Sequence, residues 1–453
     1  MAPLKVSYSG VRGIVGESLN ETVAWRFGAA FVRLMAERAT QGPVLLARDT
    51  RASGPALEAA LLAAMRPAVP DIRDLGVMGT PTVQFAMRPF AAGGAVVVTA
   101  SHNPAQWNGF KFFLGPENTV LDGAQTRRLF DLYQEVGDPS DLAAATPLPE
   151  VTEDGERAID MHVDEAMALV DAERVRARAF HVGVDTGGGA GARPLLRLLE
   201  RLGCRVEEVH VARDSEPSPE NLGGLAAAVR ERGCDLGLAQ DLDGDRLALV
   251  DDSGHPIGED YTLALAVQDL LEKNAGRRPA VVKNLSTTCV VDVLVERHGG
   301  ELVETPVGEI NLSRALARLV GEGRVAFGGE GNGGLIIPQL LLGRDSVVAA
   351  AVILDHMARH RQTLRGLVSA LPEFHLIKVK VPLSGPVDAF LETLAGQFPD
   401  GEISRADGLR IRFADRSWVA VRPSNTEPVL RVVAESPSRT WAEETVARIR
   451  AQL

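Results

Sequence analysis

The sequence predicts an α/β protein of four domains, of which three are similar and the last is of α+β type. Three observations lead to this fold class. The chain has 453 residues, which is too many for a single hydrophobic core. Short β-branched runs alternate with Ala/Leu-rich amphipathic stretches, which is typical of mixed sheets covered by helices. Only the last part of the chain contains strands joined by tight turns, which is typical of an antiparallel sheet.

The first three domains each begin with a strand that is followed by a helix and further strands, in units of about 30–40 residues. The leading strands are expected at 44–49, 181–189 and 280–286, and the helices after them at 55–68, 192–203 and 290–300. The three units share this order of elements but no strong sequence repeat, so a solenoid is not predicted.

The fourth domain is expected to be an antiparallel sheet with a closing helix. Its strands are predicted at 375–383, 406–424 and 428–436, and its helix at 439–453. The predicted domains are therefore 1–150, 151–254, 255–371 and 372–453.

Composition narrows the class of protein. The chain is 45% apolar and 24% charged, as in a soluble globular protein, and its net charge of −12 argues against nucleic-acid binding. Its three cysteines form no CxxC pair, which fits a reducing compartment. We find no signal peptide and no run of about 20 apolar residues, so we expect a cytoplasmic protein without a membrane span.

The segment DLDGDR at 241–246 is the sharpest sign of chemistry. It follows an apolar strand, and α/β sheets place their sites at the carboxyl ends of strands. Carboxylates at every second position repel one another if they converge, and a hard divalent cation such as Mg²⁺ relieves this repulsion. An EF-hand is disfavoured because Arg246 and Asp252 stand where it needs glycine and glutamate. The predicted ligands, with room for a fourth, are Asp241, Asp243 and Asp245; a solvated acidic turn is the alternative.

Ser101 lies in TASHNPAQWNGFKF, between two strand-like runs. A serine hydrolase is disfavoured because the flanks are not G-x-S-x-G, and because on extended backbone His102 would point away from its neighbour. A phosphorylated Ser101 would instead supply a good fourth oxygen for the cation. A serine turn before Pro104 is the structural alternative.

Two further loops carry polar groups suited to a phosphorylated sugar. RPSNTEPVLR at 422–431 combines a guanidinium, two hydroxyls and an amide, a set that suits a phosphate dianion. In GGEGNGG at 328–334, Glu330 can accept hydrogen bonds from sugar hydroxyls where glycines permit close approach. Either loop could also be an ordinary surface turn.

The segment VDTGGGAGA at 184–192 partly matches the dinucleotide fingerprint, with Glu207 about twenty residues further on. Nothing else in the chain serves hydride transfer, so an NAD site is disfavoured. The chain also has no Walker sequence GxxxxGK[ST], which counts against a P-loop kinase.

Taken together, these segments resemble the α-D-phosphohexomutase superfamily. Along the whole chain the family's loops occur in its order: GVRG, TASHNPAQWNGFKF, DLDGDR, GGEGNGG and RPSNTEP. The resemblance implies four domains around a central active-site cleft, with one loop from each domain.

By this resemblance Ser101 is the phosphorylated catalytic serine, and its phosphate completes a Mg²⁺ site with the three aspartates. The other residues implied near the reacting group are Arg12, His102 and Lys111. Lys111 is the candidate general acid/base, a role that a lysine can fill if burial and cationic neighbours lower its pKa. The residues implied in substrate binding are Arg246, Lys283, Glu330, Asn332, Arg422, Ser424, Asn425, Thr426 and Arg431.

The implied activity is an intramolecular phosphotransfer, an isomerase reaction. Phosphoserine gives its phosphoryl group to a hexose monophosphate, and the resulting 1,6-bisphosphate returns its other phosphate to Ser101. A hexose 1,6-bisphosphate is therefore also the expected activator. Water must be kept from the phosphoserine, which favours a closed cleft.

The sugar is inferred from departures within the family pattern. Dual-specificity phosphomannomutase/phosphoglucomutase members usually carry a histidine where this chain has Gly334, and VGEINLS at 307–313 lacks their G-H pair. Both features resemble archaeal-type phosphoglucosamine mutases, so we expect conversion of glucosamine 6-phosphate to the 1-phosphate by a monomer or homodimer. A phosphomannomutase/phosphoglucomutase is the alternative; a phosphatase and a non-catalytic phosphosugar-binding protein are less favoured.

Overall fold

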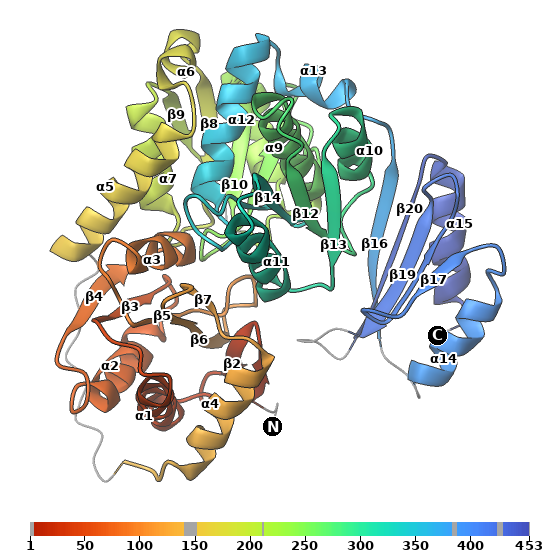
Figure 1. The fold of residues 1–453 in the computed structure, drawn as a ribbon. Helices are drawn as coiled ribbons and strands as arrows, with labels where there is room; N and C mark the ends of the chain where they lie inside the picture. Colours follow the sequence, from red (N-terminus) through yellow and green to blue (C-terminus); the bar gives the residue numbers. More distant parts are fainter. Residues whose placement is uncertain (1–3, 140–151, 211–212, 383–386, 424–428, 453) are drawn as a thin grey trace.

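The computed structural model shows four domains, each built on its own β-sheet (Figure 1). It describes residues 4–139, 152–210, 213–382, 387–423 and 429–452. Three domains have mixed sheets and the last has an antiparallel sheet, which confirms the predicted fold class. Within the described ranges, no helix is both long and apolar enough to cross a membrane.

Domain 1 is a seven-stranded mixed sheet in the order β1-β2-β6-β5-β3-β4, with β7 paired to β6. Its elements are β1 (Lys5–Ser7), β2 (Gly10–Ile14), α1 (Glu21–Glu37), β3 (Val44–Arg48), α2 (Gly54–Met65), β4 (Ile72–Val77), α3 (Thr80–Met87), β5 (Gly94–Val98), β6 (Trp107–Leu114), β7 (Thr119–Val120) and α4 (Gly123–Glu135). The central strands are buried on both faces, which explains why they are continuously apolar. On β3, Val44 and Leu46 pack towards α1 and α2, whereas Leu45 and Ala47 pack towards α3.

Domains 2 and 3 have related four-stranded sheets, ordered β11-β10-β8-β9 and β13-β12-β14-β15. In each, three strands are parallel and one edge strand, β11 or β15, is antiparallel. Domain 2 contains α5 (Glu153–Ala168), α6 (Ala172–Arg178), β8 (His181–Asp185), α7 (Ala192–Arg201), β9 (Arg205–Glu208), a 3₁₀ helix η1 (Pro219–Asn221), α8 (Gly223–Arg232), β10 (Leu236–Gln240) and β11 (Leu247–Val250). Domain 3 contains α9 (Glu259–Lys273), β12 (Ala280–Asn284), α10 (Val290–Arg297), β13 (Glu301–Thr305), α11 (Glu309–Gly321), β14 (Ala326–Glu330), β15 (Gly334–Ile336), α12 (Ser346–His360) and α13 (Leu364–Ser369).

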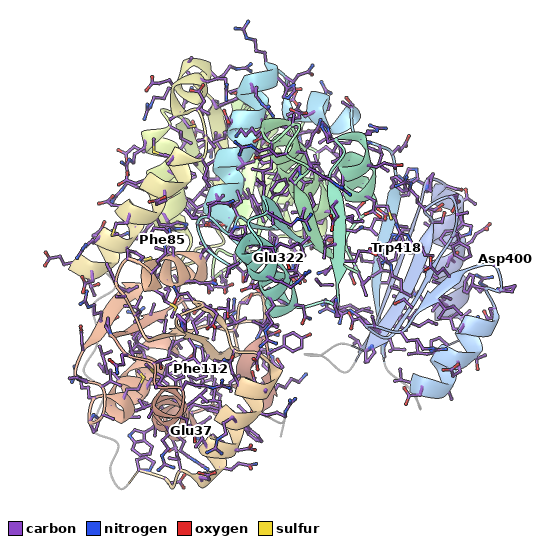
Figure 2. All side chains as sticks on the ribbon, in the orientation of Figure 1. Glu37, Phe85, Phe112, Glu322, Asp400 and Trp418 are labelled. Atoms are coloured by element: carbon purple, nitrogen blue, oxygen red, sulfur yellow. The ribbon has the colours of Figure 1, made fainter. Side chains whose placement is uncertain are left out.

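Domain 4 is a five-stranded antiparallel sheet in the order β16-β20-β19-β18-β17. Its elements are β16 (His375–Pro382), α14 (Val387–Gly396), β17 (Glu402–Ser404), β18 (Leu409–Arg412), β19 (Trp418–Pro423), β20 (Val429–Ser436) and α15 (Arg439–Arg450). Both helices cover one face of the sheet. The other face turns Trp418 towards Cys289 of domain 3 (Figure 2).

One structural feature is common to the first three domains and positions the site. In each, a parallel strand runs into a loop and then into an antiparallel strand: β5 into β6, β10 into β11, and β14 into β15. These three loops are TASHNPAQ, DLDGDR and the segment around EGNG, so each motif occupies the same place in its sheet. The shared topology therefore brings one polar loop from each domain to the centre of the molecule.

The first three domains share a continuous hydrophobic core, which packs α3 of domain 1 against α5 of domain 2 and joins both to α9 and α12 of domain 3. Phe85 of α3 marks this junction in Figure 2. Domain 4 has a separate core. The exact domain boundaries near residues 150, 254 and 371 stay a prediction.

Candidate active site

A cavity of about 450 Å³ lies between the four domains and is lined by residues of each. A volume of this size is typical of a small-molecule site. Domain 1 contributes Arg12, Ser101, His102 and Lys111; domain 2 contributes Glu216 and Arg246; domain 3 contributes Asn284, Glu309, Glu330, Asn332 and Arg344; and domain 4 contributes Lys378, Lys380, Arg422 and Arg431. Most of the predicted site residues are therefore brought to one place.

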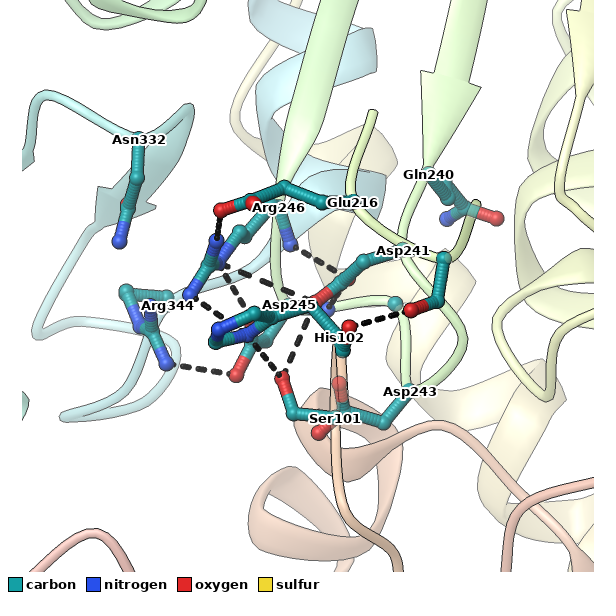
Figure 3. Close-up of polar contacts among 12 residues, drawn as sticks. Ser101, His102, Glu216, Gln240, Asp241, Asp243, Asp245, Arg246, Asn332 and Arg344 are labelled. Atoms are coloured by element: carbon teal, nitrogen blue, oxygen red, sulfur yellow. Dashed lines mark hydrogen bonds and ion pairs between the residues drawn. The ribbon is translucent and has the colours of Figure 1, made fainter. Parts of the chain in front are cut away.

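Ser101 lies at a tight turn directly after β5 and is only 1% exposed. Its φ of +50° is unusual for a residue other than glycine, and such conformations persist only where the surroundings enforce them. The backbone N–H of Ser101 donates to Thr99 Oγ1 at 2.9 Å, and its Oγ donates to Asp241 Oδ2 of domain 2 at 3.2 Å. Figure 3 shows the hydroxyl facing the aspartate loop.

Arg51, which the sequence analysis missed, holds the serine loop in place. Its guanidinium donates to four backbone carbonyls of the loop, at distances of 2.6 to 2.9 Å: Ser101, Asn103, Pro104 and Trp107. It is itself paired with Asp49 at 3.1 Å. Only a folded loop can present these carbonyls together, so the sequence had no motif that marks Arg51.

The three aspartates of DLDGDR converge as expected. Asp241, Asp243 and Asp245 are at most 1% exposed, and one oxygen from each lies within 4.8 Å of the others. Burial and the two neighbouring carboxylates raise the pKa of Asp241 well above its usual value. Although burial opposes ionisation of Asp243 as well, Lys111 holds the pKa of that carboxyl below its usual value.

The aspartates fit a divalent cation. Oδ1 of Asp243 and Oδ1 of Asp245 are buried, and neither has a hydrogen-bond partner among the described residues. Buried carboxylate oxygens without partners are costly, and a hard cation with oxygen ligands would satisfy them. Ser101 stands beside this cluster, so a phosphate on its hydroxyl would reach the same place.

Lys111 projects from β6 into this cluster. Its ammonium donates to Asp243 Oδ2 at 2.6 Å and to Asp245 Oδ2 at 2.8 Å. Burial lowers the pKa of Lys111, but the two carboxylates outweigh burial and the pKa lies above its usual value. The condition that we set for a general acid/base, a lowered pKa, is therefore not met while both carboxylates pair with the lysine.

His102 does not point away from Ser101, which corrects the expectation from extended backbone. Because Ser101 adopts a left-handed conformation, His102 Nδ1 lies 3.4 Å from Ser101 Oγ. Arg246 Nη2 donates to the same nitrogen at 3.1 Å. Burial, and then the charge of Arg246, holds the pKa of His102 well below its usual value, so the ring is neutral at pH 7 with Nδ1 as an acceptor.

Arg12 and Arg246 flank the serine from two domains. Arg12 is 7% exposed, lines the cavity, and donates to Asn103 Oδ1 of the serine loop. Burial lowers the pKa of Arg12 to about 10, which still leaves it charged at neutral pH. Arg246 also pairs with Glu216 at 3.3 Å. Both cations are placed to offset the charge of a phosphoryl group on Ser101.

On the opposite side of the cavity, Glu330 is held by a polar network. Its Oε1 accepts from Asn284 Nδ2 at 2.9 Å, and its Oε2 accepts from Asn332 Nδ2 at 3.1 Å. Arg344, a second residue that the sequence analysis missed, lies 3.1 Å from Glu330, 2.8 Å from Glu309 and 2.7 Å from Asp245. Arg344 therefore connects the GGEGNGG loop with the aspartate loop.

The position of Gly334 explains why a histidine is absent there. A Cβ atom at Gly334 would lie 2.3 Å from Cδ of Arg344, so a side chain at this position is incompatible with the observed arginine. In this chain the space next to the GGEGNGG loop is filled by the guanidinium stem of Arg344 instead.

Lys283 does not reach the cavity, and its assignment to substrate binding is corrected. It is fully buried, pairs with Asp292, and donates to the carbonyls of Thr287 and Thr288 at 3.3 and 3.2 Å. Side chains alternate across a strand, so its neighbour Asn284 lines the cavity in its place.

The two described arginines of the last loop, Arg422 and Arg431, line the cavity from β19 and β20. They are directly opposite each other on the two strands, so both side chains start from the same face of the sheet. Ser424, Asn425 and Thr426 lie outside the described residues.

The glycines of VDTGGGAGA serve packing. A Cβ atom at Gly191 would lie 2.8 Å from Cα of Gly244, inside the aspartate loop. Gly189 and Gly191 therefore pack directly on the aspartate loop.

Four family descriptions match the chain in order. They are the phosphoglucomutase/phosphomannomutase alpha/beta/alpha domains I, II and III, over residues 4–137, 160–254 and 258–374, and the C-terminal domain over 376–452. A phosphoglucomutase/phosphomannomutase of Thermococcus kodakarensis is 34% identical over 445 residues, which cover 96% of this chain and 95% of the relative. A probable phosphoglucosamine mutase of Methanopyrus kandleri is 32% identical over 458 residues, 96% of this chain and 94% of the relative.

The fold is also found in solved structures. A phosphoglucomutase/phosphomannomutase family protein of Burkholderia thailandensis superposes with a TM-score of 0.81 at 26% identity. The superposition covers 99% of this chain and 95% of that protein.

Proposed function

We propose that the protein interconverts glucosamine 6-phosphate and glucosamine 1-phosphate. The proposal starts from its family: the chain belongs to the α-D-phosphohexomutase superfamily and is therefore a phosphohexomutase-type isomerase. The reaction would proceed through phosphoserine at Ser101 and a hexose 1,6-bisphosphate. A cytoplasmic location and a monomeric or homodimeric state stay predictions.

The proposal rests on one observation: Ser101 contacts the DLDGDR loop across a domain boundary, next to a cavity that several arginines line. The hydroxyl of Ser101 donates to Asp241, and five arginines line the surrounding space: Arg12, Arg246, Arg344, Arg422 and Arg431. A serine among carboxylates would be hard to phosphorylate by itself, because two anions would meet there. With a cation on the carboxylates and arginines around them, the same place suits a phosphate dianion.

In the forward direction, a sugar hydroxyl attacks the phosphorus of phosphoserine, and the bond from phosphorus to Ser101 Oγ breaks as the new bond to the sugar oxygen forms. The attacking hydroxyl gives its proton to a nearby base, and the departing Oγ of Ser101 takes up a proton. In the second half, Ser101 Oγ attacks the other phosphate of the bisphosphate, and the isomeric monophosphate is released. His102 Nδ1 lies 3.4 Å from Ser101 Oγ, but its lowered pKa and its hydrogen bond from Arg246 make it a weak acceptor for the serine proton in that step.

We assign Asp241, Asp243 and Asp245 as the residues that would hold Mg²⁺ together with the phosphoserine. Bound there, the cation would neutralise charge on the transferred phosphoryl group. Lys111, now paired with two of these carboxylates, would then face less negative charge, which lowers the pKa of an ammonium. Under that condition it remains a candidate acid/base for the substrate.

The sugar is assigned from the domain-3 loops. Glu330, Asn332 and Asn284 present carboxylate and amide groups to the cavity, which suits sugar hydroxyls. Gly334, with Arg344 in the adjoining space, supports a loop of the phosphoglucosamine mutase type, as do the identities to relatives with that name. The similarity to the Thermococcus protein keeps phosphomannomutase/phosphoglucomutase activity as the second candidate.

The test is mutase turnover with Mg²⁺ and a trace of the matching sugar 1,6-bisphosphate. We expect kcat/KM for glucosamine 6-phosphate to exceed the values for glucose and mannose 6-phosphates. A preference for glucose or mannose would retain the mechanism and overturn the sugar. Release of inorganic phosphate as the main product would overturn the mutase in favour of a phosphatase.

A further inference from the structure

Glu259 lines the active-site cavity and has no part in the mechanism above. It is the first residue of α9 and follows Gly258, whose φ of +88° turns the chain into the helix. Its Oε1 is shielded from solvent and has no hydrogen-bond partner among the residues that the structure describes. Leaving a buried carboxylate oxygen without a partner costs free energy, so a ligand group that donates to this oxygen would be stabilised there.

The other glutamates that are held inside the cavity each have a cationic partner. Glu216 pairs with Arg246 at 3.3 Å. Glu309 and Glu330 both pair with Arg344, at 2.8 and 3.1 Å. Within the described chain Glu259 makes no such ion pair, which separates it from the carboxylates that shape the site.

The surroundings of Glu259 show why its charge is not already balanced. Burial raises the pKa of Glu259 to about 7, against the opposing effects of Lys378 and Arg246. Both cations are engaged elsewhere: Lys378 pairs with Asp260 and donates to the carbonyl of Gly331 at 2.8 Å, and Arg246 pairs with Glu216. Lys378 thereby links the neighbourhood of Glu259 to the GGEGNGG loop, where the sugar is expected.

A phosphate-binding cavity gains nothing from a further negative charge if its ligand is only an anion, because the two repel. The charge is useful if the ligand carries a positive group at that place. Among hexose phosphates, a 2-amino-2-deoxy sugar has this group, since its ammonium is ionised at neutral pH.

We propose that Glu259 recognises the ammonium group of an amino-sugar phosphate and thereby selects it over neutral hexose phosphates. The inference rests on the proposed function, in that it assumes the cavity binds hexose phosphates. An ammonium would hold the carboxylate ionised and complete a charge-assisted hydrogen bond to it, whereas beside a hydroxyl the carboxyl can take up a proton and this bond is lost. Glu259 would then be a specificity residue, with no part in phosphoryl transfer itself.

The variant Glu259→Gln tests this, because it keeps the shape of the side chain and removes the charge. We expect kcat/KM for glucosamine 6-phosphate to fall by about 10–100-fold, as for a lost hydrogen bond to a charged group. The value for glucose 6-phosphate should stay within about threefold, which also shows that the variant is folded. The matched control is Glu220→Gln, which removes the same charge from an exposed position at the edge of the cavity and should leave the ratio of the two values unchanged. Equal losses for both sugars, or no change for either, would overturn the inference.

Measurements of binding distinguish a failure of this inference from a failure of the proposed function. Calorimetric titration of Ser101→Ala, with and without Glu259→Gln, measures affinity for glucosamine 6-phosphate and glucose 6-phosphate without turnover. If the wild-type enzyme turns over no hexose phosphate, the proposed function fails, while a selective loss of glucosamine 6-phosphate affinity would still support Glu259. If turnover occurs but the affinity ratio is the same with and without Glu259→Gln, the inference fails and the mutase stands.

Discussion

The two sides of the cavity are built in different ways. On the side of domains 1 and 2, the groups that we assign to phosphoryl transfer are almost completely buried and bonded across the domain boundary: Ser101 to Asp241, and Lys111 to Asp243 and Asp245. On the side of domain 4, Arg422 faces the cavity with an ion pair of 3.8 Å to Asp407, and the domain has its own core. The difference matches the two tasks of a mutase, because phosphoryl transfer needs fixed geometry whereas binding must accept two isomers of one sugar phosphate.

Removing the hydroxyl of Ser101 gives the largest expected effect, because it deletes the group that carries the phosphoryl. Ser101→Ala should lower kcat by at least about 10⁴-fold, the scale found when a covalent nucleophile is removed. Affinity for the sugar phosphate should persist, since the binding side is untouched. Ser53→Ala, a serine beside the same sheet that accepts from Asn108, is the control and should keep its activity. Turnover by Ser101→Ala would contradict the assignment of phosphoryl transfer to the side of domains 1 and 2.

Removing the divalent cation should have the next largest effect. After chelation, we expect kcat to fall by at least about 10²-fold, because several kcal/mol of charge stabilisation is lost, and to recover when Mg²⁺ is added. In Asp243→Asn, kcat should recover less when Mg²⁺ is added after chelation. Full activity after chelation, with metal analysis of the protein confirming its absence, would refute the assignment of the aspartates.

Arg344 tests the connection between the aspartate loop of domain 2 and the loops of domain 3. Arg344→Gln leaves Asp245, Glu309 and Glu330 without their shared cation, so kcat/KM should fall by about 10²-fold. The exposed Arg314, which pairs with Asp122 across the surface, is the control, and Arg314→Gln should change neither activity nor thermal stability noticeably. An Arg344→Gln enzyme with normal kinetics would show that the aspartate loop does not depend on this contact with domain 3.

Arg422 tests the binding side alone. In Arg422→Ala, the loss of a charge-assisted contact to phosphate should raise KM by about 10–100-fold with little change in kcat. The increase should be similar for the 6-phosphate and the 1-phosphate, because the same loop would hold whichever phosphate is not reacting. Arg405→Ala, at an exposed position of the same domain, serves for comparison. A KM change confined to one isomer would contradict a shared phosphate site.

Substitutions of Lys283 and Asn284 should have the smallest effect on turnover. The two variants should differ clearly, because one should change stability and the other KM. Lys283→Met leaves the carboxylate of Asp292 short of a partner in the interior, so the free energy of unfolding should fall by about 3 kcal/mol while KM is unchanged. Asn284→Ala, one residue away but facing the cavity, should raise KM with little loss of stability. Thermal unfolding and steady-state kinetics on both variants measure these effects. A raised KM in Lys283→Met together with a loss of stability in Asn284→Ala would contradict the prediction.

The sequence predicted the parts that local patterns encode. Apolar runs such as 44–47 and 280–282 are visible without a structure, and so are the polar residues that follow them. Arg51, Arg344 and Glu259 were missed because their roles depend on contacts between distant segments. One signal for Arg344 does exist: Arg344 and Asp345 are the only charges between Leu335 and Leu354, and a charge inside so apolar a run must have a buried partner.

Two predictions failed for local reasons. The left-handed turn at Ser101 reversed the expected direction of His102, and a turn of that kind is not predictable for a serine from propensity. Lys283 lies on the same strand as Asn284, and which of the two faces the cavity depends on the register of β12 between β13 and β14.

The central claim is that Ser101 carries the phosphoryl group between the two positions of one sugar. The most direct measurement is a single-turnover experiment in which enzyme labelled with ³²P at Ser101 is mixed with unlabelled glucosamine 6-phosphate and Mg²⁺. The account predicts that the label appears first in a sugar bisphosphate and then in glucosamine 1-phosphate, while Ser101 becomes phosphorylated again with unlabelled phosphate. A label that stays on the protein during turnover, or that leaves as inorganic phosphate, would contradict it.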